Sequence, residues 1–458
     1  MGMPTRAFDG GSPDVPAAVD GEPTRVIVVG AGIAGLTAAN ALTTAGVECV
    51  VVEARERIGG RLRTVEVDGH VADLGGAWIH HPDDNVLTEW AALAGVPVVA
   101  DSSGTGFTGA DLGERRTLTA AELAGTGYAV FGPVSEQVRR DLAAGRPDTS
   151  AAAAVDAYLR TTALTGPDHD RMRQLMAAMV EQDGAGPFDD ISARWALTED
   201  MFVGDVVDDL PVGGYRSLLA PLAARSSIRQ GHPVRRIVRT DDGVTVEGDG
   251  WAEHGTHAVV TVPLGVLKAR TIEFVPPLPP ERQEAIGRTG FGTLEKVILA
   301  FEEPFWRERG LRHSVVYPAD RAEPATWTWD FGRSPTLMLL VAHSAAPTMQ
   351  RDPEAWALEQ LTALYAGPLP AQPTAVSATD WLHDEFALGA YAHVRAGSRA
   401  DDLDRLGEPV GRICFAGEHT ASERAGYADG AMTSGLREAK RLLRRTSVRL
   451  TADDRAGG

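Results

Sequence analysis

The chain has 458 residues, a formal net charge of −19 and 43% hydrophobic side chains. Its length predicts roughly two or three domain-sized units. The acidic balance disfavours nucleic acid as a partner, because no basic stripe is present to neutralise phosphates. No apolar run reaches the length of a membrane span, and the first residues lack the pattern of a signal peptide. We therefore expect a cytoplasmic protein that binds neither nucleic acid nor membrane.

The first strong pattern begins at Arg25, after a leader (1–23) whose Gly, Pro, Asp and Ala content predicts disorder. The run "VIVVG" predicts a strand, "GAGIAG" a turn and "LTAANALTTAG" a helix. Gly30 permits a sharp turn, Gly32 lets backbone amides approach a pyrophosphate, and Gly35 allows close helix packing. This order is typical of a dinucleotide-binding site, and a purely structural strand-turn-helix unit is the alternative.

A second strand, "CVVVE", ends at Glu53, about 20 residues beyond the glycines. A carboxylate at this place can accept hydrogen bonds from ribose hydroxyls, and an acid there disfavours NADP. NAD and FAD both carry adenosine, so this segment alone leaves both open.

The rest of the chain alternates apolar, β-branched runs such as "HAVVTVPL", "EKVILAF" and "RICFAGE" with turn clusters. Residues 150–182 carry Ala, Leu and Met at helical spacing, and the segment before "HAVVTVPL" predicts a hairpin. The two cysteines, Cys49 and Cys414, lie in strand-like runs and form no metal-ligand spacing. We predict a mixed α/β fold without a metal site.

Three further motifs follow the glycine loop in order: "GGR" at 59–61, "DLGGAWIH" at 73–80 and "FAGEHTASERAGYADGAMTSGL" at 415–436. With them, residues 25 to about 445 resemble the flavin-dependent amine oxidases of the monoamine and polyamine oxidase family, and the motifs are closest to polyamine oxidases. The resemblance implies a Rossmann-type FAD-binding domain interleaved with a substrate domain of sheet plus helices. The FAD-binding segments would be 24–80, 211–285 and 393–447; the substrate segments 81–210 and 286–392, and a flexible tail 448–458.

The resemblance also places residues around FAD. Arg61 would contact the diphosphate, Val234 the adenine side, Glu418 the ribityl and diphosphate region, and Trp381 the isoalloxazine ring. Ala390 stands where some relatives carry a cysteine joined to the flavin, which implies non-covalent FAD. The other cofactor-binding residues implied are Gly30, Gly32, Ile33, Ala34, Gly35, Glu53, Ala54, Arg55, Gly60, Gly75, Gly76, Ala77, Trp78, Gly417, Gly426, Tyr427 and Ala428.

Lys296 is the first candidate catalytic residue. On a strand Glu295 and Lys296 point to opposite faces, and the apolar run that follows predicts that one of the two charges faces the interior. By the resemblance it is the lysine, which would hold a water against flavin N5. A desolvated lysine has a lowered pKa and can assist oxygen reduction or imine hydrolysis.

Tyr391 and Tyr427 match the two positions that form an aromatic cage facing the flavin in many of these enzymes, and His80 matches a histidine that faces the substrate. Aromatic faces attract a cation weakly and also exclude water. Exclusion favours the neutral amine, whose lone pair assists departure of the α-hydrogen as a hydride. The resemblance implies an enzyme that oxidises small amines and reduces O2 to hydrogen peroxide.

An acidic stretch suggests which amine is used. The segment 181–209 has one basic residue, Arg194. Its acidic residues are Glu181, Asp183, Asp189, Asp190, Glu199, Asp200, Asp205, Asp208 and Asp209. Such a field can steer a polycation, which favours a polyamine, and a solvated acidic surface is the other interpretation. Other substrates remain open: monoamines, secondary amines, L-amino acids, or oxidation with an acceptor other than O2. A demethylase-like binding protein is the least favoured.

Overall fold

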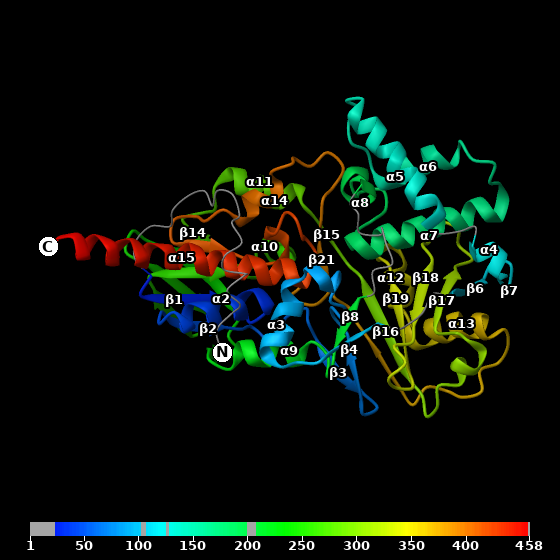
Figure 1. Cartoon of the computed structure of the whole chain (residues 1–458), viewed down its shortest axis with the longest axis horizontal. Helices are drawn as coiled ribbons and strands as arrows, with labels where there is room; N and C mark the ends of the chain where they lie inside the picture. Colours follow the sequence, from blue (N-terminus) through cyan, green and yellow to red (C-terminus); the bar gives the residue numbers. More distant parts are fainter. Residues whose placement is uncertain (1–22, 102–106, 125–127, 199–207, 457–458) are drawn as a thin grey trace.

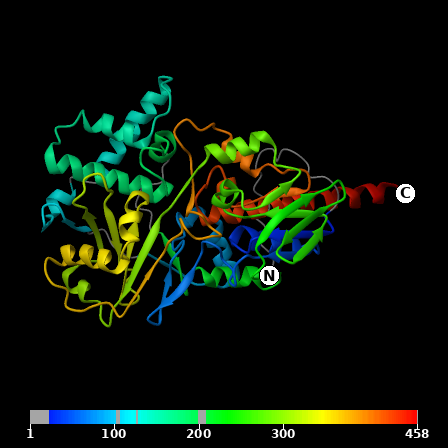
Figure 2. The same cartoon turned by 180° about the vertical axis from the view of Figure 1, so that it is seen from behind.

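The computed structural model describes residues 23–101, 107–124, 128–198 and 208–456, so the predicted leader lies outside the described residues except for Pro23. Figures 1 and 2 show two regions side by side, one around a parallel sheet and one around a larger sheet flanked by helices. Helix α15 (Ala428–Ala456) runs along the first region and continues through most of the segment predicted as a flexible tail.

The parallel sheet is the core of the first region. Its order is β22 (Ile413–Phe415), β13 (His257–Val260), β1 (Arg25–Val29), β2 (Glu48–Val52) and β9 (Ser227–Arg229). The valine-rich runs form strands that are covered on both faces, as parallel sheets require. These strands come from the segments 24–80, 211–285 and 393–447.

Different layers cover the two faces. Val26 and Val28 point toward α2 (Ile33–Thr44) and α15, which pack against each other. Ile27 points to the opposite face. That face packs against a four-stranded sheet of β12 (Trp251–Gly255), β11 (Val244–Gly248), β10 (Val234–Arg239) and β14 (Glu273–Val275), which contains the predicted hairpin.

The second region is built on a seven-stranded, largely antiparallel sheet. Its order is β20 (Ala375–Ala378), β16 (Glu295–Ala300), β19 (Thr336–Val341), β18 (Thr326–Trp329), β17 (His313–Tyr317), β6 (Phe107–Asp111) and β7 (Arg116–Thr117). Helix α13 (Pro353–Tyr365) packs on one face. Part of the other face carries α5 (Tyr128–Ala143), α6 (Ala151–Leu159), α7 (Gly166–Gly184) and α8 (Ala193–Thr198), above the sheet in Figure 1. The helical pattern of 150–182 is thus two helices, divided before Gly166 and Pro167.

Short elements join the two regions. The hairpin of β3 (Thr64–Val67) and β4 (His70–Asp73) packs against β16, and β15 (Gly290–Gly292) pairs with β21 (Tyr391–His393). The remaining helices and strands are α3 (Val86–Ala94), β5 (Val98–Ala100), α4 (Ala120–Ala124), β8 (Asp209–Pro211), α9 (Arg216–Ala223), α10 (Leu264–Ala269), α11 (Pro280–Arg288), α12 (Ala346–Met349) and α14 (Asp402–Gly407).

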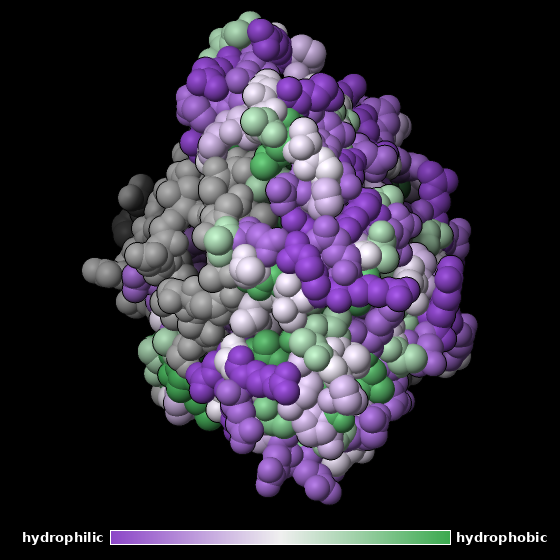
Figure 3. Space-filling model, turned by 90° about the vertical axis from the view of Figure 1, so that its right-hand side faces the viewer, coloured by the Kyte–Doolittle hydropathy of each residue, from purple (hydrophilic) through white to green (hydrophobic). Residues whose placement is uncertain are grey.

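Figure 3 shows the end of the second region, where hydrophilic side chains cover most of the described surface and apolar ones occur in small groups. Within the described ranges, no helix combines the length and the apolar character needed to cross a membrane.

Candidate active site

The glycine loop forms an open cradle at the start of α2. Gly30 has φ of 104°, and a Cβ on Gly35 would lie 2.0 Å from the Gly30 carbonyl oxygen, so both positions require glycine. Gly32 precedes α2 without a side-chain cap, and a Cβ there would meet no atom within 4 Å. A Cβ on Gly60 would reach Gly32 Cα at 3.6 Å. The uncapped helix N-terminus and the open space beside it suit a phosphate group.

Glu53 follows β2 and lies next to this cradle. Its side chain is buried, and the carboxylate accepts hydrogen bonds from Ala31 N at 2.7 Å and Arg55 N at 2.9 Å. These bonds fix the carboxylate at the carboxyl end of the sheet, where such folds bind ligands. Arg55 itself pairs with Asp384 at 2.5 Å. Ala54 lies between Glu53 and Arg55, and Ile33 and Ala34 are buried in the first turn of α2.

Arg61 and the buried Glu418 form an ion pair that ties two distant segments together. Arg61 donates to Glu418 Oε1 at 2.8 Å and to the Ala390 carbonyl at 2.6 Å. Glu418 also accepts from the backbone N–H of Ala392 and Gly426, at 3.2 and 3.0 Å. Arg61 therefore organises the loop before Tyr391, in addition to the diphosphate contact predicted for it.

The other residues predicted to bind the cofactor lie on several different elements of the two regions. Trp381 is buried with Ala390 and next to Tyr391, and Val234 begins β10. A Cβ on Gly75 would lie 1.7 Å from the Arg61 carbonyl oxygen, so this segment packs backbone against backbone. Gly76, the buried Ala77 and Trp78 follow it directly, while Gly417 precedes Glu418 and Ala428 begins α15.

Lys296 lies on β16 and reaches the end of β4. Its Nζ donates to the carbonyl oxygens of Gly75 at 2.5 Å and Asp73 at 3.1 Å, and lies 5.2 Å from the centre of the Trp78 ring. Burial lowers the pKa of Lys296 to about 8, and the charge of Asp73 offsets part of that effect. The lysine is therefore close to its titration point at mildly alkaline pH.

The prediction that only one of the charges on β16 faces the interior is incomplete. Lys296 and Glu295 are both buried, on opposite faces of the strand. Glu295 accepts hydrogen bonds from Thr293 Oγ1 and from Trp381 N, the latter at 2.9 Å. Because the seven-stranded sheet is covered on both sides here, neither face of β16 meets solvent, and Glu295 holds the segment that carries Trp381.

The two predicted cage tyrosines contact the same turn of α7. Tyr391 donates its hydroxyl to the Gln182 carbonyl, and Tyr427 donates to Asp183 Oδ1 at 2.8 Å. Burial raises the pKa of both phenols well above the ordinary value, so both stay protonated and act as donors.

His80 completes the group. Its ring meets the edge of Tyr427 at 5.4 Å between ring centres, and its Nδ1 lies 2.7 Å from Asp208 Oδ2. Trp78 lies alongside His80 with 6.2 Å between ring centres. The structure therefore brings Lys296, Trp78, His80 and Tyr427 into one continuous series of contacts.

Sequence reasoning missed the individual roles of Gln182, Asp183 and Asp208. It treated the last two as members of an acidic field, together with Glu199, Asp200 and Asp205, which lie outside the described residues. Glu181 is buried, and its carboxylate accepts from Ser344 N, Ser344 Oγ and Phe188 N. The available signal was the position of "EQDG" at the end of an apolar helical pattern, where side chains turn inward as often as outward.

The parallel sheet, the glycine cradle and the buried Glu53 define a dinucleotide-binding fold, and comparison with known sequences gives its class. Residues 33–443 match the family described as "Flavin containing amine oxidoreductase". The chain belongs to this family of flavin-containing oxidoreductases, and its cofactor is FAD. The cradle at Gly32 and Gly60, the buried Glu53 and the uncapped α2 N-terminus fit that cofactor.

The names of individual relatives refer to two different activities, polyamine oxidation and histone demethylation. The chain is 32% identical over 460 residues to "Polyamine oxidase 3" of Oryza sativa subsp. japonica, covering 92% of this chain and 90% of that protein. It is also 32% identical over 465 residues to "Lysine-specific histone demethylase 1 homolog 3" of the same organism, covering 96% of this chain and 57% of that protein. The chain thus spans little more than half the length of these demethylase relatives.

Solved structures share the fold. "Cyclohexylamine Oxidase from Brevibacterium oxydans IH-35A" superposes with a TM-score of 0.74 at 22% identity, covering 94% of this chain and all of that one. A putrescine oxidase double mutant superposes with a TM-score of 0.71 at 24% identity, covering 92% of this chain and 98% of that one.

Proposed function

We propose that the protein oxidises the C–N bond of small amines, with polyamines as the favoured substrates and O2 as the electron acceptor. The observation that carries the proposal is the convergence of Lys296 and Tyr427 on the segment that contains Trp78 and His80. These residues come from three separate parts of the chain.

The cage tyrosines orient the substrate and exclude water. Both hydroxyls are engaged by α7, so the rings of the two tyrosines, and not their hydroxyls, would contact the amine. A neutral amine has a lone pair that assists departure of the α-hydrogen, and a site walled by aromatic rings favours the neutral form. Bound FAD would accept that hydrogen as a hydride at N5 and pass the electrons to O2, which gives hydrogen peroxide; water then hydrolyses the imine.

The chemical role of Lys296 depends on whether its amino group is protonated. As an ammonium it stabilises the negative charge that O2 acquires on reduction. As a neutral amine it can take a proton from the water that attacks the imine. With a pKa of about 8, both forms are populated at mildly alkaline pH.

Amines without a carboxylate fit the charges near the cage better than amino acids do. Arg424 lies 4.7 Å from the centre of the Tyr427 ring, but it pairs with Asp429 at 2.6 Å. Only the buried Nη2 of Arg424 has no hydrogen-bond partner among the described residues, and a substrate carboxylate bound there would lie near the Asp183 carboxylate that accepts from Tyr427. L-amino acids therefore rank behind polyamines, monoamines and secondary amines as substrates.

The test is a hydrogen peroxide assay over a panel of polyamines, monoamines, L-amino acids and a methyl-lysine peptide. The peptide is included because of the demethylase relatives. Turnover of amines with stoichiometric peroxide is the expected result. Reduction of the enzyme by amines with slow reoxidation by O2 would instead indicate another electron acceptor.

The cofactor is tested separately by acid precipitation of the purified yellow protein. Because Ala390 offers no thiol, we expect intact FAD in the supernatant. Flavin that stays with the precipitate would contradict non-covalent binding, whatever the peroxide assay gives.

A further inference from the structure

The last turn of α7 meets both cage tyrosines through consecutive residues. Tyr391 donates to the backbone carbonyl of Gln182, and Tyr427 donates to the side chain of Asp183. The helix ends at Gly184, so its C-terminal carbonyls lie beside the cage. A helix C-terminus carries partial negative charge and favours a cation.

Asp183 uses only one of its two carboxylate oxygens. Oδ1 accepts from Tyr427, whereas Oδ2 is buried and has no hydrogen-bond partner among the described residues. Glu181, which precedes Gln182 in the same turn, differs from Asp183 because both of its carboxylate oxygens accept hydrogen bonds from Ser344. A buried, unpaired carboxylate oxygen is costly, and the cost disappears when a donor binds to it.

The surrounding charges leave room for one more cation. Burial raises the pKa of Asp183 to about 6, with Tyr427, His80 and Arg424 offsetting part of that effect. His80 contacts Asp208, and Arg424 pairs with Asp429 through Nε while its Nη2 is buried without a hydrogen-bond partner among the described residues. Neither base forms an ion pair with Asp183 among the described residues. The carboxylate of Asp183 therefore has no cationic partner of its own.

We propose that Asp183 and the C-terminal turn of α7 bind a second ammonium group of the substrate. This inference rests on the proposed amine oxidation and adds its selectivity: an α,ω-diamine or polyamine is preferred over a monoamine of the same chain length. The amine that reacts enters the cage neutral, and the ammonium at the other end pairs with Asp183. Recognition is by direct contact, in contrast to the long-range steering that the acidic stretch suggested.

The experiment compares α,ω-diamines with n-alkylamines of equal length, using the FAD-loaded wild type and Asp183→Asn. Asparagine keeps an oxygen that accepts from Tyr427 and removes the charge. We expect the diamine-to-monoamine ratio of kcat/KM to fall by about 30-fold or more, as for loss of one partner of a desolvated charge pair. Equal losses for both substrates would overturn the proposal, because Asp183 would then only position Tyr427.

Asp189→Asn is the matched control. Asp189 is exposed and follows the last turn of α7, and its substitution removes the same charge as Asp183→Asn does. The ratio should stay at the wild-type value in this variant. A fall as large as that of Asp183→Asn would indicate a general field effect and overturn direct recognition.

A measurement on the wild type alone keeps the proposal testable if Asp183→Asn fails to fold. The diamine preference should persist as salt rises from about 20 to about 300 mM, because a buried pair is screened much less than exposed charges. A ratio near one, or one that salt abolishes, overturns the inference while monoamine turnover still supports amine oxidation. Absence of turnover with every amine would defeat the proposed function itself.

Discussion

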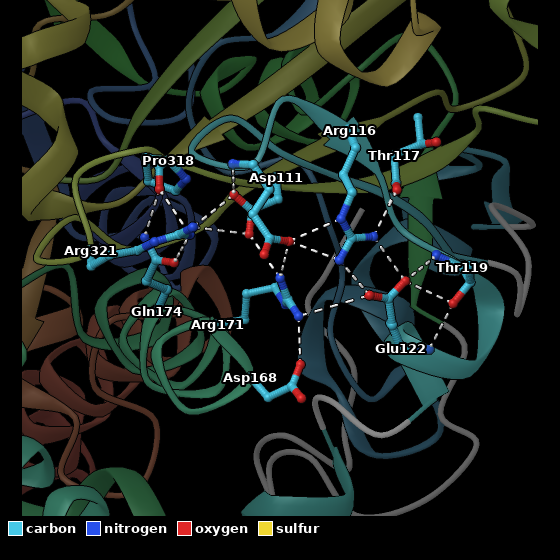
Figure 4. Close-up of polar contacts among 11 residues, drawn as sticks. Asp111, Arg116, Thr117, Thr119, Glu122, Asp168, Arg171, Gln174, Pro318 and Arg321 are labelled. Atoms are coloured by element: carbon cyan, nitrogen blue, oxygen red, sulfur yellow. Dashed lines mark hydrogen bonds and ion pairs between the residues drawn. The ribbon is translucent and has the colours of Figure 1, made fainter. Parts of the chain in front are cut away.

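Helix α7 carries a charged side chain near each end, Arg171 and Asp183, and the two differ in how many of their hydrogen bonds are formed. Near its start, Arg171 donates to Asp111 at 3.0 Å, Glu114 at 2.9 Å and Asp168 at 2.5 Å (Figure 4). Asp111, which is fully buried, also accepts from Arg321 at 2.9 Å. At the other end, Asp183 has one donor and one unpaired oxygen.

This difference in hydrogen bonding indicates that Asp111 belongs to a structural cluster, whereas Asp183 can bind a ligand. Burial alone would raise the pKa of Asp111, but hydrogen bonds from Arg321, Glu114 N and Arg171 hold it below the ordinary value. Nothing comparable offsets burial at Asp183, whose pKa rises to about 6. A carboxylate with complete partners holds α7 to β6 and the loop after β17, whereas one left incomplete is available to a ligand.

The largest expected effect is on stability, from Asp111→Asn. The change leaves Arg171 and Arg321 without their shared buried carboxylate, and we expect the free energy of unfolding to fall by about 3 kcal/mol or more. Denaturant unfolding of the FAD-loaded protein measures it. Asp168→Asn is the control, because that carboxylate is 65% exposed and should cost less than about 1 kcal/mol.

The same carboxylate predicts the pH dependence. Because the pKa of Asp111 is depressed in the folded protein, its contribution is present above the ordinary value of about 3.9 and is lost as pH falls through the folded pKa. The wild type and Asp111→Asn should therefore approach each other in stability under acid. A difference that widens on acidification would show that Asp111 is not the stabilising charge.

The second effect is kinetic, from Lys296→Met. Loss of the buried cation should slow reoxidation of the reduced flavin by about 100-fold, the usual cost of removing one group that stabilises developing negative charge. In the wild type this rate should fall as pH rises through about 8, where Lys296 loses its proton, and Lys296→Met should be flat. Stopped-flow measurements of reduction and reoxidation separate the steps. Identical rates in both proteins would remove Lys296 from the chemistry.

The sequence was informative where a residue's role depends on its neighbours in the chain. The glycine loop and the strand before it are local, and the turn geometry at Gly30 agrees with the expectation. Glu53 is buried beside the loop, and its contact with ribose hydroxyls stays a prediction. The overall α/β class and the flavin family also follow from runs and motifs. Their assembly into one parallel sheet needs strands from three distant segments, which the family resemblance supplied.

The sequence was uninformative where a role depends on a distant contact. Asp183 lies 244 residues from Tyr427, and Glu295 lies 86 residues from Trp381. A charged residue next to other charged residues suggests a solvated face, and only the tertiary packing shows that Asp183 turns toward the tyrosines. The inward position of Glu295 likewise follows from the distant segment that carries Trp381, whose backbone N–H donates to it.

A smaller effect is expected when the donor to Asp183 is removed. Tyr427→Phe keeps the ring and loses the hydroxyl, which should lower kcat/KM for amines by about 10-fold, the cost of one hydrogen bond to a buried acceptor. Tyr391→Phe is the comparison, since its hydroxyl meets a backbone carbonyl that can bind water instead. Steady-state kinetics of both variants, with FAD content as a control for folding, would reveal the difference. A greater loss of kcat/KM in Tyr391→Phe than in Tyr427→Phe would contradict the role proposed for Asp183 in binding the substrate.

The smallest effect is that of ionic strength on encounter with a polyamine. Of the acidic stretch, Glu181 and Asp183 point inward, Asp190 pairs with Arg395 at 2.8 Å and Asp208 contacts His80. Few of the described acids are left to project a field, and exposed charges are screened beyond about 10 Å at 0.1 M salt. Between low and physiological salt, kcat/KM for a polyamine should therefore fall less than about threefold, with kcat unchanged, because steering acts on association alone. A steep fall that Asp189→Asn reduces would restore the acidic stretch as a steering field and place its origin in the exposed carboxylates.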